Sequence, residues 1–543
     1  MAPWANETEP LTQPLILHDE DDRAPLLPKW NRGSDFWKLP EEKSDAFRTW
    51  LAEELFEQFR IAGPMILVSF LQYAVRVTSL MFAGHLGELA LSSSQIAFTT
   101  AGATGFNVMM GLASALETLC GQAYGAQEYR LTGIFLQRAI LVSIFIAIPI
   151  SFVWWNMAPI LIFMGQDLAI SEGAQEYSRL LIPGLFAYAF LQPLVKFLQT
   201  QSAVNAMAVM SAITLVTHVP LCYLLIYHFG LGFRGAAIAN GISQWINVLC
   251  LALYVNSSST CKKTWTGFSR AAVHDIHLFL KIAVPSTIMT CLEYWCFDCV
   301  VLMSGLLANP QLETSSLSIC INIGGLIYMV PSGLSAAAST RVSHKLGAGL
   351  PQAAKSLVKL VVILTIVEGF ALSTLLMSVR NALPYLFSND ANIVSYASSM
   401  VPFLATLSIL DACNATLSGV ARGCGWQHLG AYSNLCAFYG IGIPMGLLMT
   451  FYFHLNSYGL WIGLICGVFT QAVLLSFITF TLNWQTLADE AAELVHEAKD
   501  HDEHCKAKTG RDLEVCKTPD ICGSVAASYN ECGFISTMNI PER

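Results

Sequence analysis

The chain has 543 residues, of which 54% are hydrophobic and only 12% are charged, and its formal net charge is −9. Soluble globular proteins carry about twice that charged fraction, so the composition excludes a water-soluble fold and predicts an integral protein of the lipid bilayer. The acidic excess lies near the two ends of the chain, and no basic patch interleaved with aromatic residues indicates nucleic-acid binding.

The first 55 residues are polar and contain several prolines, a composition typical of a disordered tail. Asp22 stands four positions before the pair Leu26-Leu27, a pattern that resembles the sorting signals of lysosomal and vacuolar membrane proteins. We therefore expect this chain in the vacuolar membrane rather than in the plasma membrane.

Twelve apolar stretches follow, each long enough to cross about 30 Å of hydrocarbon as a helix. We expect these helices at 61–84, 92–115, 132–155, 178–199, 206–228, 236–256, 280–306, 315–338, 357–380, 394–418, 431–453 and 458–482. They predict a first six-helix lobe at 56–260, a linker at 261–275 and a second six-helix lobe at 276–485. The remaining tail, 486–543, is expected to begin as a surface helix.

Lysine and arginine are concentrated in the segments after the second, sixth and eighth predicted helices. Loops on the cytosolic side of a membrane carry such an excess of positive charge. We therefore expect a multi-pass protein with both termini and the linker in the cytosol.

The two lobes share an internal sequence repeat. Arg60-Ile-Ala-Gly-Pro64 recurs 221 positions later as Lys281-Ile-Ala-Val-Pro285, and Gly125-Ala126 recurs 222 positions later as Gly347-Ala348. Because each lobe has an even number of helices, both insert in the same direction and are related by an axis along the membrane normal. The sequence therefore predicts an all-α polytopic membrane protein with two six-helix bundles related by a pseudo-twofold axis, and a substrate path between them.

Two carboxyl groups lie deep in the second lobe. Glu293 is about 18 Å along its helix, and Asp411 is similarly deep. The repeat places the amides Gln72 and Gln192 at the equivalent first-lobe positions. A charge at this depth costs roughly 2.5–3.5 kcal/mol, and packing alone would be served by an amide in both lobes. We therefore expect Glu293 and Asp411 to bind protons or a cation.

Other polar and aromatic residues in the apolar stretches are weaker candidates. Asp298 is a third candidate for proton or cation coupling. It follows Glu293 by five residues, which places it about 140° further round the helix, so the two cannot both face one cleft fully. Arg76 lies on the face of Gln72 and could pair with an acid across the cleft. The residues expected to line the substrate cleft are Gln72, Tyr73, Arg76, Gln192, Tyr294, Trp295, Asn322, Tyr328 and Asn414.

Several functional classes find no support in the residue pattern. The cysteines and histidines have no metal-ligand spacing, and no nucleophile–base arrangement suggests catalysis. We expect no metal, no cofactor and no enzymatic activity. Glu117 is a candidate for a transport role, but its place near a helix end equally favours capping a helix or anchoring a loop. Lys196 is expected to extend toward the membrane surface.

Long motifs carry a family resemblance over residues 55–485. The segment Leu116-Glu-Thr-Leu-Cys-Gly-Gln-Ala-Tyr-Gly125 resembles a signature of the plant branch of multidrug and toxic compound extrusion (MATE) transporters. Second-lobe segments are similar to further motifs of that family, namely Cys291-Leu-Glu-Tyr-Trp295, Glu313-Thr-Ser-Ser-Leu-Ser-Ile319, Arg341-Val-Ser-His-Lys-Leu-Gly-Ala-Gly349 and Gly419-Val-Ala-Arg-Gly-Cys-Gly-Trp-Gln427.

The resemblance implies a two-lobed, V-shaped fold of twelve helices and proton-driven export of small organic compounds from the cytosol. We expect the protein to be a monomer. It also implies that Glu293 and Asp411 form the cation site of the second lobe. Arg76 departs from the family pattern and keeps open an exporter of organic anions such as citrate. A flippase for lipid-linked precursors is a further alternative, but its cleft would be dominated by basic residues.

Overall fold

The computed structural model describes residues 44–307, 309–387 and 390–515. The chain forms two units, residues 1–57 and residues 58–543. The described residues of the first unit, 44–57, are helical. All functional residues discussed below belong to the second unit, and Asp22, Leu26 and Leu27 lie outside the described residues.

The described residues are almost entirely helical, and twelve helices among them are long and apolar enough to cross a membrane, as the sequence predicts. The elements of the first half are α1 (Ser44–Gly84), α2 (Glu88–Ala101), η1 (Gly102–Phe106), α3 (Asn107–Gly125), α4 (Tyr129–Trp155), α5 (Met157–Phe163), α6 (Leu168–Thr200), α7 (Val204–Tyr223), η2 (Leu224–His228) and α8 (Phe233–Ser257). In this bundle α6 packs against α2, α3, α4 and α8.

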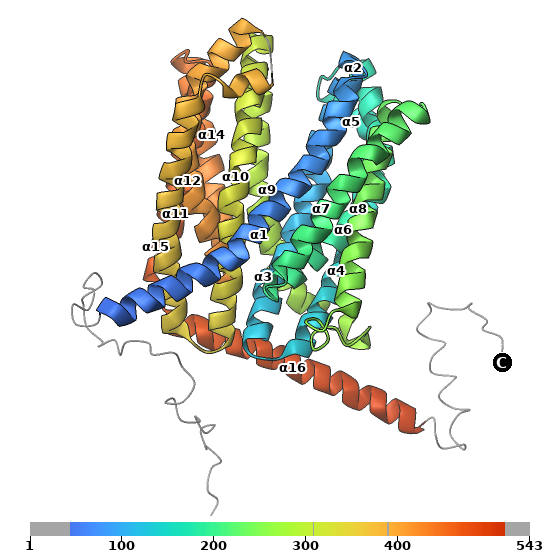
Figure 1. The fold of residues 1–543 in the computed structure, drawn as a ribbon, viewed down its shortest axis with the longest axis vertical. Helices are drawn as coiled ribbons and strands as arrows, with labels where there is room; N and C mark the ends of the chain where they lie inside the picture. Colours follow the sequence, from blue (N-terminus) through green and yellow to red (C-terminus); the bar gives the residue numbers. More distant parts are fainter. Residues whose placement is uncertain (1–43, 308, 388–389, 516–543) are drawn as a thin grey trace, which may run out of the picture. The chain divides into compact units, whose positions relative to one another are not determined.

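The second half repeats this arrangement around α12, which packs against α10, α11 and α15. A short helix, η3 (Arg270–Ala272), precedes it in the linker. The elements of the second half are α9 (Ile276–Ser304), α10 (Pro310–Gly347), α11 (Pro351–Val379), η4 (Leu383–Leu386), α12 (Ala391–Cys424), α13 (Gln427–Asn434), η5 (Leu435–Gly442), α14 (Ile443–Leu447), η6 (Leu448–Tyr452) and α15 (Ser457–Thr481). The expected fold class, two six-helix bundles, is confirmed (Figure 1).

Helices α3 and α10 pack closely, and their contacts follow the internal repeat. A Cβ atom on Gly125 would overlap the backbone oxygen of His344, and one on Gly347 would overlap the backbone oxygen of Gln122. His344 and Gly347 follow Gln122 and Gly125 by 222 positions. Each helix therefore presents equivalent residues to the other, as a twofold axis between them requires. We call these four residues the α3–α10 seam.

The seam also explains why two helices are longer than expected. The second and eighth membrane helices continue to Gly125 and Gly347, beyond the predicted ends at 115 and 338. Their last turns contain polar residues. A prediction that rests on the length of apolar stretches assigns such residues to loops. These turns remain helical because they pack against each other at the seam.

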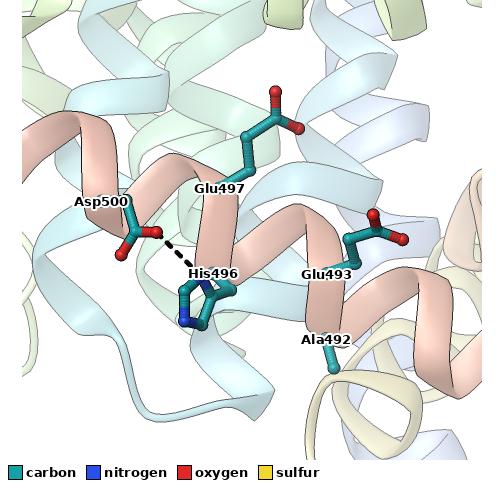
Figure 2. Close-up of a pocket in the computed structure, with 5 residues that line it drawn as sticks. All are labelled: Ala492, Glu493, His496, Glu497 and Asp500. Carbon is teal, nitrogen blue, oxygen red and sulfur yellow. Dashed lines mark ion pairs between the residues drawn. The ribbon is translucent and has the colours of Figure 1, made fainter.

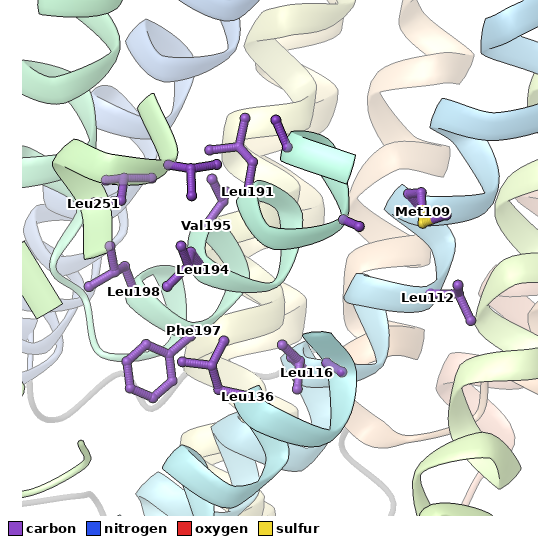
Figure 3. Close-up of a cluster of buried hydrophobic side chains, with 14 of the residues drawn as sticks. Met109, Leu112, Leu116, Leu136, Leu191, Leu194, Val195, Phe197, Leu198 and Leu251 are labelled. Carbon is purple, nitrogen blue, oxygen red and sulfur yellow. The ribbon is translucent and has the colours of Figure 1, made fainter. Parts of the chain in front are cut away.

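Alanine, leucine and other apolar side chains fill the interior of the first bundle. Figure 3 shows Leu116 of α3, Leu136 of α4 and Phe197 of α6 gathered in one cluster. All three are buried, with at most 1% of their surface exposed. This apolar packing holds α6 in place and thereby fixes the position of its polar residues.

Beyond the last membrane helix, α16 (Trp484–Val515) contacts α3, α10 and α11 at the seam end of the bundles (Figure 1). The surface helix expected after residue 485 is thus present. Its buried positions Trp484, Leu487, Ala488, Ala491, Val495 and Ala498 follow helical spacing.

Candidate coupling site and substrate cleft

The structure brings Glu293 and Asp411 together inside the second bundle. Glu293 is on α9 and Asp411 is on α12, both half-buried and close enough for their charges to interact. The hydroxyl of Tyr328, on α10, donates to Oε1 of Glu293 at 3.5 Å. Three helices therefore contribute to one cluster of two carboxyl groups and a phenol.

The first bundle has amides on the corresponding helices. Gln72 is on α1, and its side-chain nitrogen is buried with no hydrogen-bond partner among the described residues. Gln192 is on α6 and is buried, with 5% of its surface exposed. The two bundles share a helix arrangement, but only the second places two ionisable groups together at these positions.

Arg76, on α1, and Asp298, on α9, form a second set of charges in the region of the cleft. The guanidinium of Arg76 is 5.3 Å from the centre of the Tyr73 ring. Its charge interacts with Asp298 and Tyr294 of α9 and with Tyr188 of α6. The acid across the cleft that interacts with Arg76 is therefore Asp298, although no carboxylate oxygen among the described residues is within 4.0 Å of the guanidinium.

Two aromatic residues that follow Glu293 lie between the bundles. Tyr294 and Trp295 are exposed by 37% and 40%. Nε1 of Trp295 donates to the backbone oxygen of Ala103, in η1 of the first bundle, at 2.9 Å. Together with Tyr73, these rings provide flat apolar surface beside the charged groups.

The two asparagines that were expected in the cleft make other contacts. Asn322 donates to the backbone oxygen of Ser318 in its own helix at 2.9 Å. Asn414 is buried and donates to the backbone oxygen of Val468, on α15, at 2.9 Å. This hydrogen bond lies inside the second bundle, so the structure does not bring Asn414 to the carboxyl pair.

Glu117 and Lys196 do not have the roles expected from their positions near helix ends. Glu117, on α3, has no exposed surface. One carboxylate oxygen pairs with Nζ of Lys196 on α6, and the other accepts from Nε of Arg422 on α12 at 3.0 Å. Glu117 therefore links the two bundles and caps no helix, while Lys196 points inward to this pair instead of toward the membrane surface.

Arg422 connects this ion triad with the carboxyl pair. Its guanidinium also donates to the hydroxyl of Ser335, on α10, at 3.0 Å. Its charge interacts with that of Glu293. The sequence does not single out Arg422, because the residue falls in a glycine-rich motif at a helix end, although its positive charge next to an apolar helix is a usable signal.

The described residues contain no group of three His, Cys, Asp or Glu side chains that could hold a metal ion. The side chains at the site supply carboxyl, phenol, amide and guanidinium groups. Such groups can bind protons, cations or hydrogen-bonding organic molecules.

Known proteins share both the sequence and the fold. Residues 64–224 and 285–448 match the MatE family model. The chain is 47% identical to Protein DETOXIFICATION 16 of Arabidopsis thaliana over 459 residues, which cover 84% of this chain and 93% of that relative. The crystal structure of the eukaryotic MATE transporter AtDTX14 matches with a TM-score of 0.80 and 44% identity, covering 82% of this chain and 99% of that one. An outward-facing multidrug resistance MATE family transporter matches with a TM-score of 0.71 at 17% identity, a likeness of fold alone that covers 81% of this chain and 96% of that one.

Proposed function

Because the chain belongs to the MatE family of membrane transporters, we propose that it is a proton-coupled antiporter that exports small organic compounds from the cytosol. Its family consists of transporters and not of enzymes. The observation that carries the coupling proposal is the pair Glu293 and Asp411, whose counterparts in the first bundle are amides.

The chemistry of the pair supports exchange of a proton for a substrate. Two adjacent carboxylates repel each other, and binding of a proton or a cation relieves that repulsion. Protons entering from an acidic compartment displace a cationic substrate, and a substrate entering from the cytosol displaces the protons. Alternating exposure of the pair to the two sides then couples the two flows.

The aromatic side chains support substrates with flat rings, such as alkaloids, flavonoids or xenobiotics. The Tyr73 ring lies beside the guanidinium of Arg76, and Tyr294 and Trp295 are exposed by 37% and 40%. Aromatic faces attract organic cations and also stack on uncharged rings. Gln72, Gln192 and Tyr328 add polar groups of the kind that orient a bound organic molecule.

One observation favours a second candidate, an exporter of organic anions. Arg76 is exposed, and within the described chain its guanidinium has no carboxylate at ion-pair distance. An arginine at this depth of a membrane protein is costly unless a ligand or water interacts with it. A citrate-type anion would satisfy this group, and Asp298 would oppose that anion from the facing helix. Among the residues proposed to line the cleft, three acids outnumber Arg76, the one arginine of that set, so a lipid-linked anionic substrate is the weaker fit.

Further parts of the proposal concern assembly and location. We propose that the protein acts as a monomer, with both termini in the cytosol, and resides in the vacuolar membrane. The location rests on Asp22, Leu26 and Leu27, which lie outside the described residues. Replacing both leucines with alanine should move a fluorescent fusion from the vacuolar membrane to another membrane, and an unchanged distribution would refute this signal.

Transport by the purified protein in proteoliposomes tests the proposal. An imposed pH gradient should drive ethidium, a flat aromatic cation, into vesicles that are acidic inside, whereas an imposed sodium gradient should not. Uptake of labelled citrate into the same vesicles tests the second candidate. Accumulation driven only by sodium would contradict proton coupling, and accumulation of citrate without ethidium would establish the anion exporter.

A further inference from the structure

The first half of α16 packs on the second bundle. Trp484, Leu487, Ala488 and Ala491 are each at most 5% exposed. They belong to one apolar cluster with residues of α10 and α11, including Leu346 and Val358. Because α15 ends only two residues before α16 begins, this half is also tethered to the second bundle by the chain itself.

The second half of α16 packs on the first bundle. Val495 and Ala498 are buried in the cluster that includes the interior of the first bundle. Lys499 pairs with Glu128, in the turn between α3 and α4, at 2.7 Å, and Asp502 accepts from Arg130 of α4 at 3.2 Å. One helix therefore spans both bundles at the seam end. Residues up to Ala491 pack on the second bundle, and residues from Val495 onward pack on the first.

The linker between the bundles is held by the same half of the helix. Nδ1 of His501 lies 3.4 Å from a carboxylate oxygen of Asp275, the residue before α9. That oxygen is also 3.8 Å from the guanidinium of Arg138, on α4. Residues 495–502 of α16 thus contact both the first bundle and the linker.

The outer face of α16 is acidic. Glu493, Glu497 and Asp500 are exposed, and Figure 2 shows them along this stretch of α16, with His496 paired to Asp500 at 3.0 Å. Helices that lie on anionic membrane surfaces present lysine and arginine instead. The apolar face of α16 packs on the two bundles, and its acidic face is suited to contact with water and not with an anionic membrane surface.

We propose that α16 is a strap that holds the seam ends of the two bundles together, and that residues 495–502 detach from the first bundle whenever the cleft opens at that end. This inference rests on the proposed function, because alternating access requires the bundles to separate at the seam. The second half is the part that releases. Its buried side chains are small, its ion pairs are partly exposed, and the first half is tethered to α15.

Seam opening can be measured through a thiol placed inside it. Ser343 of α10 is buried, and a Cβ atom on Gly121 of α3 would overlap its hydroxyl. In a Ser343→Cys background, a maleimide added to the α16 side labels this position only when α3 and α10 separate. Cys120 is buried within the first bundle, its Sγ 3.5 Å from the backbone oxygen of Thr132. It serves as an internal control in the same mass spectrum.

Charge exchange at one ion pair provides the test in the full-length protein. Lys499→Glu and Glu128→Lys should each raise the labelling rate about fivefold, because either reversal replaces an attraction between α16 and the first bundle with a repulsion. The double variant restores an ion pair of opposite polarity and should return the rate close to that of the parent. Glu497→Lys, a charge reversal on the outer face of the same helix, should leave the rate unchanged.

Hydrogen exchange of residues 495–502 shows whether α16 has detached in each variant. Faster exchange with unchanged labelling would overturn the strap, as would equal labelling of the single and double variants. Unchanged exchange and labelling in both single variants would also overturn it. Because the readout is seam opening and not substrate movement, failure of proton coupling would leave these results intact, and the two proposals fail separately.

Discussion

Glu117 is an acid with no access to solvent, placed between Lys196 of its own bundle and Arg422 of the other. A buried ion triad of this kind is sensitive to removal of its central member, because the remaining charges lose their compensation. The triad therefore joins the two bundles through one central carboxylate.

We predict that Glu117→Gln lowers the free energy of unfolding by about 3–5 kcal/mol, the usual effect of breaking a buried ion pair. Glu176→Gln is the matched control, because Glu176 pairs with Arg234 at a site where both side chains are exposed. That change should have an effect of at most about 1 kcal/mol. Thermal unfolding in detergent measures both, and similar shifts for the two variants would contradict the assignment.

Cys261 lies outside the membrane-spanning segments, in the linker, and is fully buried. Burial raises the pKa of its thiol to about 11. Since the thiolate is the reactive form, maleimide labelling of Cys261 in the folded protein should be negligible at pH 7.5 and should increase as the pH rises toward 11. Rapid labelling at pH 7.5 under native conditions would show that the thiol is not held in this environment.

At the level of residues, the sequence predicts the acids Glu293 and Asp411 because a charge in an apolar helix stands out locally. It does not predict the ion triad, because the partners of Glu117 are 79 and 305 positions away. A position near a helix end suggested capping, whereas tertiary packing buries the carboxylate. Likewise, Asn414 looked like a polar residue of the cleft, but its partner is the backbone of α15.

Among the helices, the α3–α10 seam depends on residues without side chains. We predict that Gly347→Ala destabilises the protein by about 1–3 kcal/mol, because the added methyl group overlaps a backbone oxygen that cannot rotate away. Gly63→Ala is the control, since nothing lies within 4 Å of its Cβ position and its repeat counterpart is Val284. Denaturant titration compares them, and equal stability of the two variants would contradict the close contact.

Helix α16 permits a test with two adjacent alanines. Ala491 is 2% exposed within the second-bundle contact, whereas Ala492 is exposed on the outer face. Ala491→Asp should place an unpaired charge against α10 and α11 and lower stability by at least about 2 kcal/mol, while Ala492→Asp should change it little. A melting temperature lowered equally by both substitutions would show that this face of α16 is not buried.

The existence and order of the helices are predictable from the lengths of the apolar stretches, because a membrane imposes a minimum span. Their interruptions are less predictable. The eleventh membrane helix passes through two π-helical turns, η5 and η6, which no residue pattern had indicated. The last turns of α3 and α10 were also missed, because their stability comes from the seam and not from lipid.

In the whole molecule, the repeat offset of 222 positions reappears as reciprocal contacts across the seam, so the sequence predicts the symmetry of the bundles. Charge breaks that symmetry. Glu293 and Asp411 occupy the second bundle, while Gln72 and Gln192 occupy the first. The symmetric framework explains how a cleft can alternate between two sides, and the asymmetric charge explains how one bundle can bind protons.

Uphill transport in proteoliposomes, compared among three isosteric amide variants, tests this central claim most directly. Glu293→Gln and Asp411→Asn should abolish accumulation of ethidium against its gradient under an imposed pH gradient, while downhill movement persists. Glu368→Gln is the matched control, because Glu368 is a half-buried carboxyl of α11 that does not belong to the pair. It should transport like the unmodified protein. If both variants of the pair accumulate substrate as well as the Glu368→Gln protein does, then Glu293 and Asp411 do not couple proton flow to transport.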